Sequence, residues 1–219
     1  MKQLKLLFIE ASPRKANANA TSGALGRRLV DAISARSGRQ VELVERNIGA
    51  QPLPAMSAEY AESVLLPPGE GAARYGDALA VSDQLIAELK WADVVVIASP
   101  VHNFTVPASL KLWIDHVLRN NVTFRNTPEG KIGLLEDRPT LIAVSSGGAM
   151  FRDPPRQPDF FRPYLTAALG VIGLRDISFV AATGLAFTEE PMAQVQSQAD
   201  AWIDDGLAAF LQRFEKAAA

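Results

Sequence analysis

The stretch from Asp93 to Leu118, DVVVIASPVHNFTVPASLKLWIDHVL, passes from a run typical of a buried strand to a run typical of a helix. Asp93 is followed by four consecutive β-branched residues, Val94 to Ile97, and such continuous apolar runs are typical of strands that are covered on both faces. Pro100 and Pro107 bracket the loop PVHNFTVP that follows and stiffen it. Apolar residues then recur at helical spacing, at Leu110, Ile114, Val117 and Leu118. The stretch therefore predicts a strand, a rigid loop and a helix.

The same alternation runs along the rest of the chain. Further strands are predicted at residues 4–12, 40–46, 139–146 and 176–184, and further helices over 25–33, 81–89, 159–174 and from residue 189 or 190 to about 215. This order predicts an α/β fold with a five-stranded parallel sheet and helices on both faces. A length of 219 residues suits one such domain, spanning 1–219, better than two.

Two stretches interrupt the alternation. Residues 47–75 are rich in proline, glycine and alanine, and are either a surface insertion or something more ordered. Residues 122–138 are typical of a β-excursion around the turn TPEG. The second stretch carries Val122, Phe124, Ile132 and Leu134, more apolar surface than a free loop exposes. We expect that something covers this stretch, or that it covers something.

Composition excludes several classes of function. The 22 basic and 24 acidic residues leave a net charge of −2. This charge lacks the basic excess typical of nucleic-acid-binding proteins. It is also less negative than expected of an electron carrier that docks to basic redox partners. The chain has no cysteine, which excludes disulfides, thiolate nucleophiles and thiolate metal sites. The N-terminal apolar run reads as a strand rather than a leader, and no apolar run approaches the length of a membrane span. We expect a cytoplasmic protein.

Ligands of such sheets bind beyond the carboxyl ends of the strands, so the loops there are the candidate sites. The loop after the first strand, SPRKANANATSG (12–23), lacks both the dinucleotide and the P-loop glycine patterns. Its hydroxyls, amides and backbone N–H groups at a helix start suit a phosphate monoester. Alternatively, Thr21 or Ser22 is simply a helix N-cap.

The other two loops suit a flat ring. His102 and Phe104 offer planar surfaces and Asn103 an amide, unless Phe104 is core and His102 merely exposed. The paired glycines of SSGGAMFRD (145–153) allow close approach of the backbone to a ligand, unless they form an ordinary turn.

The sequence resembles the flavodoxin-like FMN-dependent NADH:quinone oxidoreductases, also called azoreductases. The resemblance is carried by VHNFTVPASLKLWIDHVLRNNVTF, EGKIGLL, SSGG and PYLTAALGVIGLRDISFVAATGLAF, in that order. It implies a flavodoxin-like fold with FMN as cofactor and no metal. The implied FMN-binding residues are Ser12, Ala20, Thr21 and Ser22 at the phosphate, Val101, His102, Asn103 and Phe104 along one side of the ring, and Ser145, Ser146, Gly147 and Gly148 at its other edge. Relatives often carry tyrosine in place of His102 and arginine in place of Ser146.

The resemblance also implies an activity. NADH or NADPH would reduce the flavin by hydride transfer, and a small aromatic acceptor such as a quinone, an azo compound or a nitroaromatic would then take its place in a ping-pong cycle. His102 and Asn103 are the residues that could assist. The family's site lies at a homodimer interface, which is expected here at Val122–Leu135 and Asp159–Tyr164. The alternative is a flavodoxin-type FMN electron carrier without NAD(P)H activity of its own.

Overall fold

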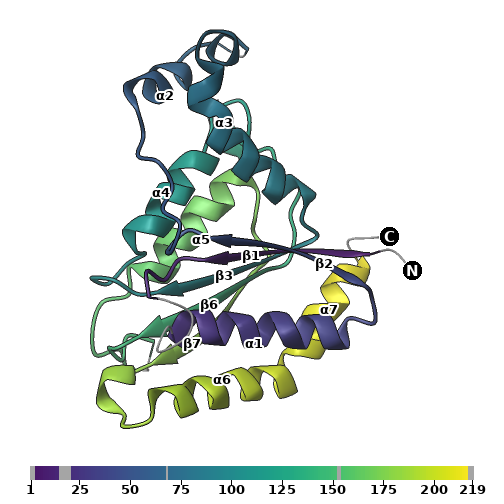
Figure 1. The fold of residues 1–219 in the computed structure, drawn as a ribbon, viewed down its shortest axis with the longest axis vertical. Coiled ribbons are helices and arrows are strands. Elements are labelled where there is room, and N and C mark those ends of the chain that lie inside the picture. The colour runs from purple at the N-terminus through teal and green to yellow at the C-terminus, as the bar shows by residue number, and fades with distance from the viewer. Residues whose placement is uncertain (1–2, 15–20, 68, 152–153, 217–219) are drawn as a thin grey trace.

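A parallel sheet of five strands forms the centre of the molecule (Figure 1). The computed structural model describes residues 3–14, 21–67, 69–151 and 154–216. The strands are β1 (Leu4–Glu10), β2 (Val41–Asn47), β3 (Val94–Pro100), β6 (Thr140–Ser146) and β7 (Ile177–Thr183). They lie in the order β2-β1-β3-β6-β7, and every neighbouring pair is parallel. The five predicted strands and their parallel arrangement are confirmed.

Helices cover both faces of the sheet. Figure 1 shows α1 (Thr21–Arg36), α6 (Pro191–Asp205) and α7 (Leu207–Lys216) on one face, and α3 (Glu70–Trp91), α4 (Ala108–Val117) and α5 (Phe161–Ile172) on the other. Side chains of β3 alternate between the two cores: Val96 packs with α1 and α6, whereas Val95 and Ile97 pack with α3, α4 and α5. Burial on both faces explains why the strand reads as a continuous apolar run. Among the described residues, no helix combines the length and the apolar content needed to cross a bilayer.

The chain reverses direction across the sheet between β1 and β3. From β1 it runs through α1 to the edge strand β2, and then returns past β1 to β3. The loop after β1 therefore leads to one face, and the loop after β3 to the other. Such a switch point opens a crevice at the carboxyl ends of the strands.

The passage at residues 47–75 is more ordered than a simple surface insertion. It contains α2 (Ala58–Ser63), and α3 begins at Glu70, well before the predicted start at Val81. Helix α2 and the N-terminal part of α3 extend away from the sheet in Figure 1. Tyr60 anchors α2 to α4, because its ring is buried and its hydroxyl donates to the backbone oxygens of Asp115 and His116 at 3.2 and 3.4 Å.

The second interruption is the predicted β-excursion. Strands β4 (Phe124–Thr127) and β5 (Gly130–Gly133) form an antiparallel hairpin. Phe124 and Leu135 are buried in their own chain, and the Leu135 N–H donates to the Ile172 oxygen at the end of α5. Ile132 and Leu134 stay exposed. The chain thus covers part of the apolar surface that the sequence contains and leaves the rest open.

The predicted single C-terminal helix is wrong in one respect, because the helix breaks at Gly206. Gly206 separates α6 from α7, and its N–H donates to the Trp202 oxygen at 2.7 Å. A Cβ at this position would lie 2.8 Å from Trp202 Nε1, so the indole packs directly on the glycine backbone. The break also brings Phe210 edge-on to Trp202, with ring centroids 5.6 Å apart.

Candidate functional site

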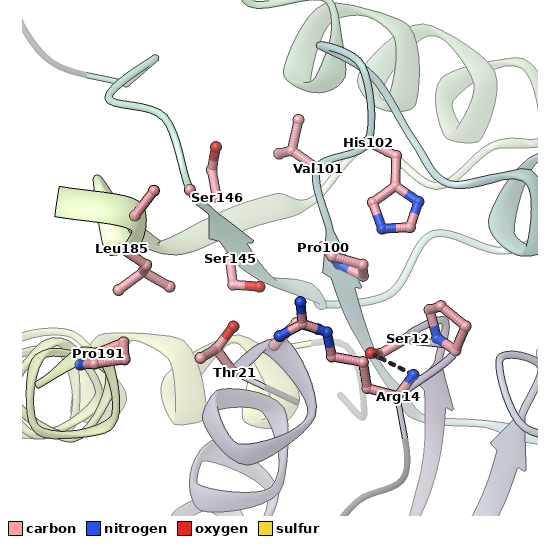
Figure 2. A pocket seen from close by; sticks show the side chains of 14 residues that line it. Ser12, Arg14, Thr21, Pro100, Val101, His102, Ser145, Ser146, Leu185 and Pro191 are labelled. Carbon is pink, nitrogen blue, oxygen red and sulfur yellow. Dashed lines mark hydrogen bonds between the residues drawn. The ribbon is translucent and has the colours of Figure 1, made fainter. Parts of the chain in front are cut away.

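A cavity of about 500 Å³ opens at the carboxyl ends of the strands, within the range of small-molecule sites (Figure 2). Loops after four strands contribute to it: those after β1, β3, β6 and β7. The described lining residues are Ser12, Pro13, Arg14, Thr21, Ser22, Pro100, Val101, His102, Ser145, Ser146, Gly147, Leu185, Ala186 and Pro191. The structure therefore brings together residues from all three loops that the sequence pointed to.

The loop after β1 is held firmly at its start. The Ala11 N–H donates to the Ala98 oxygen at 2.9 Å, and the Arg14 N–H to the buried Ser12 Oγ at 3.3 Å. Gly49, just after β2, lies so close that a Cβ there would overlap the Ser12 carbonyl. The backbone of Ser12 is thus fixed from two neighbouring strands.

The first turn of α1 supplies the polar end of the cavity. Thr21 and Ser22 are its first two residues, and no acidic side chain lies in this turn. Ser22 is 1% exposed, and its hydroxyl has no hydrogen-bond partner among the described residues. A buried hydroxyl without a partner beside a helix N-terminus suits an anionic ligand, because unpaired buried polar groups are costly. Ala20, also expected at the phosphate, lies outside the described residues.

The loop after β3 contains a tight turn. His102 and Thr105 exchange backbone hydrogen bonds of 2.9 and 3.0 Å, and both central residues have positive φ, 48° for Asn103 and 72° for Phe104. Positive φ at both positions is typical of a type I′ turn; asparagine tolerates it well, whereas a bulky residue does not.

The turn divides the predicted ring-binding residues. Val101 and His102 line the cavity, whereas Asn103 and Phe104 lie in the exposed part of the turn, with Phe104 45% exposed. Within one chain the structure does not bring these last two side chains into the cavity lining. Their contact with the flavin stays a prediction.

The loop after β6 forms the opposite wall. Ser145 and Ser146 are buried and, with Gly147, line the cavity. The carbonyls of Gly147 and Gly148 accept hydrogen bonds from Ala186 and Gly184, at 3.1 and 3.0 Å, and so fix the loop after β7. Gly148 itself lies behind the wall, where a Cβ would overlap the Gln157 side chain.

Sequence reasoning missed six of the lining residues: Pro13, Arg14, Pro100, Leu185, Ala186 and Pro191. Leu185 and Ala186 belong to the short 3-10 helix η1 (Leu185–Phe187) after β7. The rule that ligands bind beyond the carboxyl ends of strands applies equally to β7, which neighbours β6, so this signal was available. Arg14 lies within the first loop and is a natural partner for a phosphate.

A buried carboxylate lies at the end of β1, beside the site. Glu10 is mostly buried, Asn47 Nδ2 donates to its Oε2 at 3.2 Å, and its Oε1 has no partner among the described residues. Burial raises the pKa of Glu10, while the charge of Arg27 acts in the opposite direction. Glu10 is not part of the described cavity wall, and its side chain bonds to Asn47 of the neighbouring strand β2.

Comparisons with known proteins identify the family of the chain. The profile of the flavodoxin-like fold family matches residues 4–205. An FMN-dependent NADH:quinone oxidoreductase of Pseudomonas fluorescens is 44% identical over 194 residues, which are 89% of this chain and 91% of that protein. The chain belongs to this family. A second FMN-dependent NADH:quinone oxidoreductase, from Cupriavidus pinatubonensis, is 39% identical over 198 residues, covering 90% of this chain and 95% of that protein.

The fold of the family is also seen in a solved structure. An FMN-dependent NADH-azoreductase from Bacillus anthracis, determined in complex with FMN, superposes with a TM-score of 0.75 over 95% of this chain and 99% of that chain, at 21% identity. At this identity the likeness shows the fold alone. With the family match, it confirms the predicted flavodoxin-like α/β class.

Proposed function

We propose that the protein is an FMN-dependent NAD(P)H:quinone oxidoreductase that also reduces azo compounds. Residues 1–219 would form a single FMN-binding domain. The observation that carries the proposal is the cavity at the β1/β3 switch point, with Val101, His102 and Leu185 around it. At one end lies the buried Ser22 hydroxyl, which has no hydrogen-bond partner in the part of the chain that the structure describes. The names of the relatives support FMN, NADH and a quinone.

The residues of the cavity fit FMN. Ser12, Thr21 and Ser22 would hold the phosphate, and Val101, His102, Ser145, Ser146 and Gly147 would border the ring. Asn103, Phe104 and Gly148 would act from just outside the cavity wall. When bound, FMN supplies the hydride-accepting and hydride-donating chemistry, so the protein needs no nucleophile of its own.

The chain's own contribution is positioning. The paired backbone hydrogen bonds of the 102–105 turn fix His102 at the cavity wall, from which its ring can orient a planar substrate or hold a proton. One cavity serving both NAD(P)H and the acceptor implies that they bind in turn, which gives ping-pong kinetics. NADH or NADPH as reductant supports a cytoplasmic location for the reaction.

The proposal includes a homodimer that completes the site. Exposed apolar side chains near the cavity support it: Phe160 is 60% exposed, and its N–H donates to the Phe104 oxygen at 3.2 Å, which joins the start of α5 to the turn. Ile132 and Leu134 add exposed apolar surface on the hairpin. Light scattering at low micromolar concentration should give the mass of a dimer, and a monomer would contradict this part of the proposal.

An anaerobic visible spectrum tests the activity. The purified protein is loaded with FMN, desalted, titrated with NADH and then with a soluble quinone. We expect flavin absorbance to stay with the protein, to bleach with NADH and to return with the quinone. Loss of FMN on desalting contradicts the proposal. Bound FMN that neither NADH nor NADPH reduces would instead indicate the electron carrier.

A further inference from the structure

His102 is the one described lining residue of the cavity whose side chain can release a proton near neutral pH. The other polar side chains of the described lining are the hydroxyls of serine and threonine and the guanidinium of Arg14, which stays charged in proteins. Histidine, by contrast, changes its charge between about pH 5 and 8. Proton transfer from this lining to a substrate therefore has a single candidate among these side chains.

The loop after β3 holds the imidazole at the boundary between the cavity and the solvent. The Val101 N–H donates to the Ser145 oxygen at 2.8 Å, and the paired hydrogen bonds with Thr105 fix the backbone of His102 itself. The residue is exposed and lines the cavity, and Figure 2 shows its ring directed toward the facing wall that carries Arg14. The ring can thus meet a ligand in the cavity and also exchange protons with water.

The charged groups near the imidazole leave a proton available to a substrate. Of the described lining residues from the loops after β1, β6 and β7, Arg14 alone carries a permanent charge. At the start of α5, which the Phe160 N–H joins to the Phe104 oxygen of the turn, Asp159 forms an ion pair with Arg162. The described lining therefore contains no carboxylate that would take up the proton in place of a substrate.

Reduction of a quinone needs one proton in addition to the hydride. The hydride brings an electron pair and forms an O–H bond at one carbonyl oxygen, so that negative charge develops on the other oxygen. A general acid that donates a proton there during hydride transfer accelerates a reaction by about 10²- to 10⁴-fold.

We infer that protonated His102 is a catalytic residue that supplies this proton to the acceptor. An N–H bond of the imidazolium breaks, its electron pair stays on the ring, and the new O–H bond completes the hydroquinone. Water then returns a proton to the imidazole. This inference rests on the proposed function, in which NAD(P)H supplies the hydride through the flavin.

The test compares an acceptor that needs a proton with one that does not. Protein loaded with FMN and reduced with NADH is mixed anaerobically, in a stopped-flow instrument, with a soluble benzoquinone or with ferricyanide, which takes up electrons without protons. Flavin absorbance gives the rate of reoxidation from about pH 6 to 9, the range in which histidine loses its proton. A second mixing experiment gives the rate of flavin reduction by NADH.

The variant is His102→Gln, which keeps a polar side chain but has no acidic proton to donate. Arg28→Gln is the control for the loss of a positive charge, because Arg28 is exposed on α1 and pairs with Asp200 outside this cavity. Visible spectra after desalting check that each protein retains FMN.

We expect His102→Gln to slow reoxidation by the quinone by about 100-fold or more at low pH, while reoxidation by ferricyanide and reduction by NADH change less than about threefold. The wild-type rate with the quinone should fall as the pH rises, whereas the rate of the variant should not. Added imidazole should restore part of the quinone rate in the variant, since it supplies the missing acid. Arg28→Gln should behave as wild type.

Two results would overturn the inference and leave the proposed function standing. One is an equal slowing of His102→Gln with the quinone and with NADH or ferricyanide, which would mean that the ring only orients its ligands. The other is an unchanged quinone rate, which would mean that water supplies the proton. A wild-type protein that does not retain FMN, or whose FMN neither NADH nor NADPH reduces, would instead remove the proposed function, and this inference with it.

Discussion

The ring of Tyr60 on α2 stands edge-on to the ring of His116 on α4, with 5.5 Å between their centroids and an angle of 77° between their planes. His116 Nε2 lies 3.0 Å from the Pro54 oxygen, and Ser82 Oγ donates to the His116 oxygen at 2.6 Å. Segments 54–60 and α3 therefore meet at one histidine of α4. This contact holds the excursion at residues 47–75 on the body of the protein.

Substitution of Tyr60 tests that attachment. Tyr60→Ala should lower the free energy of unfolding by about 3–5 kcal/mol, as removal of a buried aromatic ring does, and Tyr60→Phe by about 0.5–1.5 kcal/mol through loss of the hydroxyl bonds. Urea denaturation measures both. Tyr75→Phe is the control, because Tyr75 donates to Glu62 at an exposed position. Equal effects of Tyr60→Phe and Tyr75→Phe would contradict the expected anchor.

Glu10→Gln should stabilise the protein at neutral pH. Burial raises the pKa of Glu10 above its ordinary value of 4.5, with Arg27 opposing this and Glu45 adding to it. A raised carboxyl pKa makes ionised Glu10 a cost to folding above the folded-state pKa, and this cost disappears as the pH falls below the unfolded value.

Melting temperatures of wild type and Glu10→Gln across pH 4 to 8 measure this effect. We expect the variant to be more stable at pH 7 and the difference to shrink toward pH 4. A difference that grows as the pH falls would show that the ionised carboxylate is stabilising, contrary to the prediction.

Two helical glycines should respond to alanine with opposite signs. At Gly26 on α1, a Cβ would lie 2.7 Å from Ala98 Cβ and 2.8 Å from Phe8 Cε2, whereas at Gly76 on α3 nothing lies within 4 Å. Gly26→Ala should destabilise by about 1–3 kcal/mol through overpacking. Gly76→Ala should stabilise by about 0.5–1 kcal/mol, because alanine is the better helix former. Denaturant midpoints measure both effects. A Gly26→Ala protein as stable as wild type would be inconsistent with close packing of α1 on the sheet, and a destabilised Gly76→Ala protein would contradict the second prediction.

Gly49→Ala should weaken FMN binding although Gly49 lies outside the cavity. Its N–H donates to the Glu10 oxygen at 3.1 Å, and an added Cβ would displace the Ser12 carbonyl and shift the first loop. We expect at least about a tenfold higher FMN dissociation constant, since loss of about 1.4 kcal/mol of binding free energy suffices for this. Fluorescence quenching measures it, with Gly76→Ala as the control. Unchanged FMN affinity in a folded Gly49→Ala protein would show that Gly49 does not support the binding site.

The sheet could be predicted because its central strands β1, β3 and β6 are buried and therefore apolar in sequence, and because the edge strand β2 alternates apolar and polar residues. The site could be predicted in part, because the loops after β1, β3 and β6 carry polar or planar residues at the required edge. Leu185 and Ala186 were not predicted as site residues because apolar side chains in a sequence are indistinguishable from those of the hydrophobic core. The loop that carries them is held at the cavity by hydrogen bonds from Gly184 to Gly148 and from Ala186 to Gly147, which only the structure reveals.

Other features depend on tertiary contacts. Ile203, Leu207 and Phe210 are all buried and continue one apolar stripe, so periodicity gives no sign of the break at Gly206, which depends on the Trp202 ring. Helix α2 is hard to predict for a different reason. It has only six residues, and just two of them, Tyr60 and Ser63, are buried.

The left-handed backbone of Phe104 carries a cost in folding stability at a single exposed position. Glycine would adopt a φ of 72° without strain, whereas a bulky side chain there costs about 1–3 kcal/mol. The molecule retains an aromatic ring that its own core does not require, at a place where a smaller residue would make a sturdier turn. Selection for thermal robustness alone would remove this ring early, so a heat-adapted laboratory population should lose Phe104 unless the proposed flavin contact gives the ring a use.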